Sequence, residues 1–185
     1  MIKYSNYGLN KDGLKMDLIT IRNSINTNKR RWNNILTTNC YAYALGLDIA
    51  ENEIKECAYQ PGVISCSFES IDRTEHFAYS TLIDCIHSDM QKLGIDIREV
   101  DPFEIVPDDE WKIALFTVFH AYEFYSEYLS DFHFLRQNKD GIWYHKPGYY
   151  KNPTNKDYNR QIITNPLECE LYNKQYRKCY SLKLR

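Results

Sequence analysis

Three residues of the sequence have the types and the order that thiol chemistry requires: Cys40, His133 and His145. A cysteine nucleophile needs a base within hydrogen-bonding reach and a third polar group that orients this base. We predict that Cys40 is the nucleophile, that His133 is the general base and later the general acid, and that His145 orients His133. Such a set could form a thioester with an amide substrate, and it needs neither a metal nor a cofactor.

Other polar residues are candidates for the supporting roles. Asp131 is the alternative third member, because residues two apart in a strand lie on the same face. The predicted oxyanion donors are the backbone N–H of Cys40 and the side-chain amide of Asn39 or Gln60. These last two assignments rest on role alone.

The same region holds residues with a functional and a packing interpretation. Trp143 and Tyr144 could wall a substrate groove, although aromatic residues on hairpins more often pack against their neighbours. Lys146 is expected to be solvated in a turn that closes the hairpin. Arg136 and Asp140 are expected to form a surface pair of small energetic value.

A short helix is predicted to carry Cys40. Thr38 or Asn39 can cap a helix with the sequence CYAYALGL, and Gly46 would end it. Cys40 would then lie in the first helical turn, where free N–H groups and the positive end of the helix dipole favour a thiolate.

A β-hairpin is predicted to carry both histidines. The aromatic-rich runs 132–137 and 142–146 are joined by the turn sequence Asn-Lys-Asp-Gly. A two-residue turn sets His133 opposite Lys146 and next to His145. One step of register would bring the two imidazoles closer, and both registers keep them in one cross-strand neighbourhood.

The remaining patterns predict the elements that would support this site. They comprise a turn at 60–62, a long helix over 69–93 that ends at Gly94, and strands at 95–100, 112–120 and 178–184. We expect an α+β domain over residues 33–185, in which the Cys40 helix packs on an antiparallel sheet, preceded by an N-terminal arm over residues 1–32.

Composition narrows the function classes. The 185 residues include 23 Lys and Arg and 25 Asp and Glu, a formal charge of -2, which argues against a nucleic-acid or anionic-membrane partner. Residues 1–30 contain no apolar segment typical of a secretory signal, and no run is long enough for a transmembrane helix. We expect a cytoplasmic protein, or one delivered into a host cell without a classical signal peptide.

The six cysteines are therefore expected to be reduced. Cys57, Cys66, His76 and Cys85 do not have the spacing of a zinc site, so no metal is predicted. The other cysteines are expected to be small buried residues, and Cys40 differs from them because the hairpin histidines can activate it. His76 and His87 lie in the predicted long helix, where a solvated or capped histidine is expected. His120 could reach the site from a neighbouring strand.

The order of these residues resembles that of the papain-like cysteine hydrolases. A short helix with Cys, a strand with His and a following strand with a second polar residue is their arrangement, and the Cys-His-His form with this spacing is similar to the NlpC-type and CHAP-type peptidases and amidases. In NlpC-type enzymes Asp usually precedes the nucleophile, whereas here Asn39 does. The segments NCYAYAL, QPG and DFHFLRQNKDGIWYHKPG also resemble an uncharacterised bacterial and viral family with NCYNYA, QPG and DYHWYRQD-x-DG-x-WSHKPG.

The resemblance implies a papain-like peptidase, amidase or deamidase that acts on a protein or peptide. Attack of an amine on the thioester would instead give a transglutaminase-like acyltransferase. A third possibility is a binding or inhibitory module that has the papain-like fold without turnover, because a fold does not establish an activity.

Overall fold

The computed structural model describes residues 25, 38–47, 60–65, 79–122, 125–148 and 151–185, with the side chains of 119–130 left aside. The helices and strands within these ranges are α2 (Cys40–Leu45), α3 (Tyr79–Leu93), β1 (Ile95–Glu99), β2 (Glu110–Tyr122), β3 (Tyr125–Gln137), β4 (Trp143–His145) and β5 (Gln175–Leu184). None of the helices described is long and apolar enough to cross a membrane.

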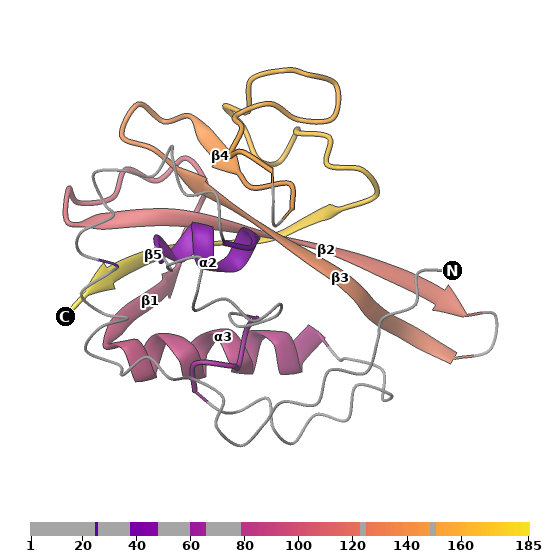
Figure 1. Cartoon of the computed structure of the whole chain (residues 1–185), viewed down its shortest axis with the longest axis horizontal. Helices are drawn as coiled ribbons and strands as arrows, with labels where there is room; N and C mark the ends of the chain where they lie inside the picture. Colours follow the sequence, from indigo (N-terminus) through magenta and orange to yellow (C-terminus); the bar gives the residue numbers. More distant parts are fainter. Residues whose placement is uncertain (1–24, 26–37, 48–59, 66–78, 123–124, 149–150) are drawn as a thin grey trace.

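The strands form one antiparallel sheet in the order β1-β5-β2-β3-β4 (Figure 1). The long strands β2 and β3 pair along most of their length, and β5 lies on the other side of β2. Within the sheet, the short strand β4 pairs with residues 135–137 of β3. The predicted α+β class and antiparallel sheet are thereby confirmed.

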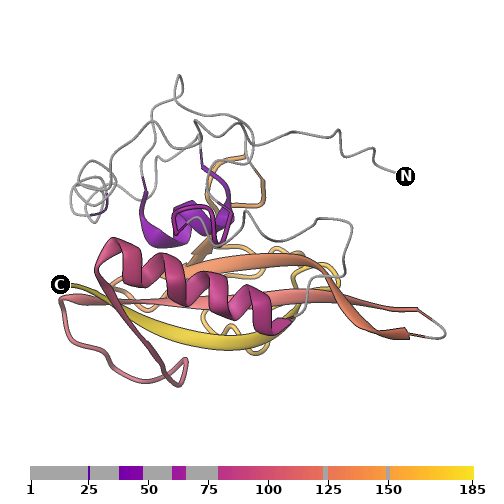
Figure 2. The same cartoon turned by 90° about the horizontal axis from the view of Figure 1, so that it is seen from below.

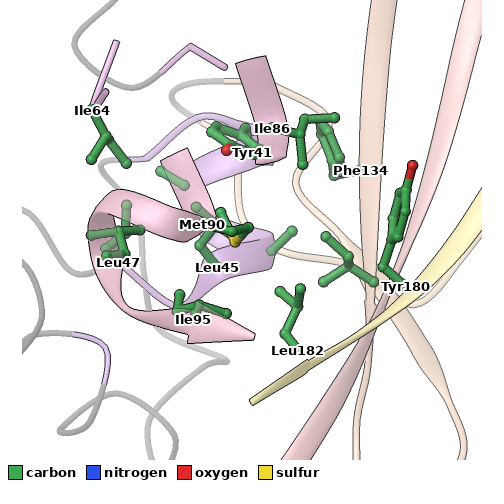
Figure 3. Packing of buried hydrophobic residues seen from close by; sticks show 14 of the residues in the cluster. Tyr41, Leu45, Leu47, Ile64, Ile86, Met90, Ile95, Phe134, Tyr180 and Leu182 are labelled. Atoms are coloured by element: carbon green, nitrogen blue, oxygen red, sulfur yellow. The ribbon is translucent and has the colours of Figure 1, made fainter. Parts of the chain in front are cut away.

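The main hydrophobic cluster joins both helices to one face of the sheet (Figures 2 and 3). The ring of Tyr41 of α2 packs at a tilt against that of Phe134 of β3, with ring centres 5.0 Å apart, and Met90 of α3 is fully buried in the same cluster. Ile25, the one described residue of the predicted N-terminal arm, is buried there too. The rest of that arm lies outside the described residues.

The opposite face of the sheet is covered by the chain that follows β4. Here Leu135 and Trp143 pack with Ile163 and Leu171 in a second buried cluster. In Figure 1 this segment forms the orange and yellow loops at the top. Side chains of β3 therefore alternate between a face under the helices and a face under the loops.

The ends of α2 follow directly from its sequence. The Asn39 side-chain oxygen accepts a hydrogen bond of 2.8 Å from the Ala42 N–H, which caps the helix as predicted. Gly46 ends the helix in the left-handed conformation with φ of 77°, and the Gly46 and Leu47 N–H groups bond back to the carbonyls of Tyr43 and Ala42. These hydrogen bonds cap the C-terminal end of the helix, so α2 has only six residues.

Arg136 of β3 fixes the C-terminal end of α2 on the sheet. Its guanidinium lies 5.2 Å from the centre of the Trp111 ring and donates to the Ala44 carbonyl oxygen, as does the Trp111 indole N–H. Arg136 is buried, so the predicted surface pair with Asp140 is wrong. A cation at the carbonyl end of a helix is favourable.

We expect Gly46→Ala to destabilise the fold more than Gly141→Ala. Both glycines have φ near +80°, so each substitution carries the left-handed strain of about 1–2 kcal/mol. A methyl group at Gly46 would also lie 2.5 Å from the buried Arg136 guanidinium, which must shift at a cost of about 1–3 kcal/mol, whereas at Gly141 the nearest atom is 3.9 Å away. Urea unfolding of both variants measures the difference, and equal losses would contradict this packing.

Asp89 of α3 connects α2, α3 and the turn 60–65. Its buried carboxylate accepts hydrogen bonds from the Tyr41 hydroxyl at 3.1 Å and from the backbone N–H groups of Gly62 and Ser65 at 2.7 and 2.8 Å. Burial raises the pKa of Asp89, against the lowering effect of these donors. Asp89 and its three donors, the Asp89 hub, thus fix the first turn of α2 relative to α3 and the turn 60–65.

The predicted elements correspond closely to those observed. The turn at 60–62 lies within the turn 60–65, and the long helix is confirmed over Tyr79–Leu93, with its predicted first part, 69–78, outside the described residues. The predicted strands 95–100, 112–120, 132–137 and 178–184 correspond to β1, β2, β3 and β5. β2, β3 and β5 are longer than predicted because polar and aromatic residues continue each pairing.

Candidate active site

The turn between β3 and β4 has three residues, which selects the second of the two registers that the sequence left open. The Asn138 N–H bonds to the Ile142 carbonyl oxygen at 2.8 Å, and Gly141 supplies the left-handed residue of the loop with φ of 80°. Consequently His145 pairs with Leu135 rather than with Phe134. This register puts His145 on the same face of the sheet as His133, as the pleat requires.

The two histidines are joined in a directed chain of hydrogen bonds. His133 Nε2 lies 2.8 Å from His145 Nδ1, and His145 Nε2 lies 3.0 Å from the Lys156 carbonyl oxygen. A carbonyl oxygen can only accept, so His145 carries its proton on Nε2 and accepts at Nδ1. His133 therefore donates from Nε2, and Nδ1 is the basic atom of its neutral ring.

The segment after β4 holds this chain in place. The backbone of His145 exchanges two hydrogen bonds of 2.8 Å with that of Thr154, which brings the Lys156 carbonyl oxygen beside the ring. This is the arrangement of an oriented base: His133 is fixed by His145, and His145 by the backbone. The orienting role predicted for His145 agrees with this geometry.

Both imidazoles are neutral at pH 7. Burial lowers the pKa of His133 well below 6.5, and positive charge on His145 and Lys174 lowers it further. Burial also lowers the pKa of His145, although its bond to the Lys156 carbonyl oxygen opposes the shift. A neutral His133 has the free electron pair that a general base needs.

Cys40 and both histidines line one pocket of about 590 Å³. Cys40 reaches it at the edge of β3, just beyond the last residue that β4 pairs with, where the Phe134 backbone forms a hydrogen bond with the thiol. Among the described contacts the thiol and the His133 ring make no hydrogen bond to each other. Further walls come from the segments 146–148, 154–158 and 171–174.

The resting Cys40 is a thiol. Burial raises the pKa of Cys40 to about 11, an effect that the hydrogen bonds of the Phe134 and Tyr41 backbones only partly oppose. The start of the helix was predicted to favour a thiolate, and burial of the sulfur opposes that effect. A six-residue helix provides little dipole stabilisation to offset the desolvation of the sulfur.

Asp131 lines the pocket but does not orient His133. Its carboxylate forms an ion pair with Lys174, and among the described hydrogen bonds it has none with the His133 ring. His145 therefore occupies the position for which Asp131 was the alternative. Lys174, in the turn after Tyr172, instead brings its positive charge near His133.

The predicted oxyanion donors are only partly in the pocket. Asn39 lines it beside Cys40, but its side-chain oxygen is engaged in capping α2. Gln60 is not among the lining residues, and its side-chain oxygen is buried without a hydrogen-bond partner. The backbone N–H of Cys40 keeps its predicted place at the first turn of α2.

The predicted groove residues Trp143 and Tyr144 do not line the pocket. Trp143 is fully buried in the second cluster, beneath the loops, and so has the packing role that was the alternative interpretation. The rim of the pocket is formed instead by Tyr158 and Tyr172, whose rings lie 5.6 Å apart and are largely exposed. Their positions in irregular chain gave no periodic signal in the sequence.

Lys146 is a pocket residue whose role the sequence did not predict. It was expected in solvent, but its side chain is fully buried and donates to the Gly148 carbonyl oxygen at 2.8 Å. Burial lowers the pKa of Lys146 to about 8, against the effect of negative charge on Cys40. A continued alternation from β4, which places Lys146 on the helix-bearing face, was the available signal.

Cys40, Cys85, Cys169 and Cys179 are free thiols in the described structure. Within the described ranges no group of three or more His, Cys, Asp or Glu side chains could hold a metal ion. Cys57, Cys66 and His76 lie outside these ranges, as does the side chain of His120. His87, expected to serve the long helix, packs edge-on to the Tyr180 ring.

Comparison with known proteins gives no relative for this chain. No family model matches it, and neither a curated protein nor a solved structure is significantly similar. The function is therefore inferred from the geometry of the pocket.

We expect the reactivity of Cys40 with iodoacetamide to persist through neutral pH and to rise towards pH 11. His133 is neutral above its lowered pKa, so the base stays available as pH rises, while the thiol ionises near its pKa of about 11. A pH series of alkylation rates, followed by mass spectrometry of the Cys40 peptide, measures this. A plateau reached already at pH 5 would indicate a resting ion pair and contradict the neutral state.

Proposed function

We propose that this protein is a papain-like cysteine hydrolase that cleaves an amide bond in a protein or peptide through Cys40. The observation that carries the proposal is the directed chain from the Lys156 carbonyl oxygen through His145 to His133, in the pocket that Cys40 lines. Such a chain leaves Nδ1 of His133 as the base and stabilises the ring when it gains a proton.

The reaction begins with transfer of the Cys40 thiol proton to Nδ1 of His133. The sulfur attacks the amide carbon, and collapse of the tetrahedral intermediate breaks the carbon–nitrogen bond while His133 returns the proton to the leaving amine. A water molecule then loses a proton to His133 and attacks the thioester carbon. The carbon–sulfur bond breaks, the acid is released, and His133 returns its proton to the sulfur, which regenerates the thiol. His145 keeps its hydrogen bond to His133 throughout.

The proposal requires a side-chain rotation at Cys40. In the resting pocket the thiol interacts with the Phe134 backbone. The proposed proton transfer requires a rotamer that brings the sulfur to Nδ1 of His133. A cysteine side chain reaches its other staggered positions by rotation about its single χ angle. Substrate that displaces water from the pocket also strengthens the attraction between the thiolate and the protonated His133.

Free thiols of this kind belong in a reducing compartment such as the cytoplasm.

A binding module without turnover is the second candidate. The observation that favours it is the raised pKa of Cys40 together with the absence of a hydrogen bond between the described Cys40 and His133 side chains. In that case the pocket would hold a protein segment without any covalent step.

The two candidates differ in what they do to proteins. Wild type and Cys40→Ala are incubated with the same cell lysate, and new protein termini and deamidated side chains are identified by mass spectrometry. The hydrolase produces sites that are absent with Cys40→Ala. Identical sites with both proteins, in lysates from several sources, would count against hydrolysis and favour the binding module.

A further inference from the structure

Lys146 lies beside the candidate nucleophile on the helix-bearing side of the hairpin. It directly follows β4, which contacts α2, and it lines the same pocket as Cys40. Its side chain is fully buried, and its ammonium is held at 2.8 Å by the Gly148 carbonyl oxygen. Negative charge on Cys40 raises the pKa of Lys146, against the effect of burial.

A fully buried lysine is costly to the fold, because an ammonium loses its hydration there. At this position the buried positive charge can contribute to the reaction. Transfer of a proton from Cys40 to His133 creates a negative charge on a desolvated sulfur, and a fixed positive charge close by stabilises that charge strongly where the dielectric constant is low.

We propose that Lys146 is a further catalytic residue, whose ammonium stabilises the Cys40 thiolate as the thiol proton moves to His133. Lys146 keeps its own protons throughout: the S–H bond of Cys40 breaks, the N–H bond forms at Nδ1 of His133, and the sulfur retains the electron pair. The inference rests on the proposed function, since it assigns a role within the same site.

The two histidines and Lys146 divide the task by their positions. His133 and His145 lie on the loop-covered face of the hairpin, and continued alternation from β4 puts Lys146 on the opposite face. All three line the pocket together with Cys40. This arrangement lets Lys146 attract the thiolate without competing for the His133 proton site.

The test compares alkylation of Cys40 by iodoacetamide at pH 7 in wild type, Lys146→Met, Lys146→Gln and Lys146→Arg. Lys139→Met is the control, because Lys139 is an exposed lysine in the turn of the same hairpin and its loss changes the net charge equally. Rates are taken from the Cys40 peptide, and thermal melting establishes that each variant is folded. The full pH profile is recorded for each protein.

We expect Lys146→Met and Lys146→Gln to alkylate about tenfold more slowly at pH 7. The difference from wild type should shrink as pH rises above the Lys146 pKa of about 8, where the wild-type ammonium loses its charge. Lys146→Arg retains most of the rate, and Lys139→Met matches wild type. Equal profiles for wild type and either folded neutral variant would overturn the assignment. A wild type that shows the Lys146 effect but cleaves no amide would instead sink the proposed hydrolysis and leave the assignment standing.

Discussion

His133→Ala is expected to slow acylation of Cys40 at pH 7 by about 10²- to 10⁴-fold, the usual contribution of a positioned base. The thiol has a pKa of about 11, so without the base almost no thiolate forms at neutral pH. The release of p-nitrophenolate from an activated acetyl ester in a rapid-mixing experiment measures this rate.

His87→Ala is the matched control, since His87 is an exposed histidine on α3, away from the residues that line the pocket. It should acylate Cys40 at the wild-type rate. His145→Gln tests positioning: a smaller loss, with an altered pH profile, is expected because His133 loses its fixed tautomer. If His133→Ala acylates as fast as His87→Ala, His133 is not the base.

Asp89→Ala is expected to give the largest loss of stability, about 3–5 kcal/mol in the free energy of unfolding. Removal of the carboxylate leaves the Tyr41 hydroxyl and the N–H groups of Gly62 and Ser65 without their acceptor in the core. Loss of this hub also frees the start of α2, so the reactivity of Cys40 should become less dependent on His133. Urea unfolding at pH 7 measures the change.

Asp84→Ala is the control for that loss, because Asp84 is an exposed aspartate on the same helix. A surface substitution of this kind changes stability by only about 0.5 kcal/mol. Since burial raises the pKa of Asp89, its charged form is disfavoured in the folded protein, and the wild type gains stability from this group as pH falls. Asp89→Ala should not show that gain. Comparable losses in the free energy of unfolding for both variants would show that the hydrogen bonds of Asp89 contribute no more to stability than an exposed aspartate does.

The helix with Cys40 and the hairpin with the histidines could be predicted because local signals determine both. Asn39 and Gly46 are strong cap residues, and the turn sequence marks the hairpin. The register could not be predicted, because the same turn residues fit loops of two and three residues and only the positive φ of Gly141 selects the longer loop. The length of the loop decides whether the histidines share a face.

Burial of the charged residues could not be predicted either. Arg136 and Lys146 look like surface residues by type, and their burial depends on where α2 lands on the sheet and on the course of the chain after β4. Such contacts join residues that are far apart in the sequence. Arg136, for example, donates a hydrogen bond to the Ala44 carbonyl oxygen. For the same reason the raised pKa of Cys40 was missed, since desolvation depends on the assembled pocket.

The most direct test of the account is to locate the acyl group after brief exposure of the protein to an activated acetyl ester. Intact-mass measurement and peptide mapping should find one acetyl group on Cys40 in the wild type and none there in Cys40→Ala, with His133→Ala strongly reduced. Acetylation spread over lysines and other cysteines, with Cys40 modified no faster in wild type than in His133→Ala, would contradict the central claim that Cys40 is a nucleophile activated by His133.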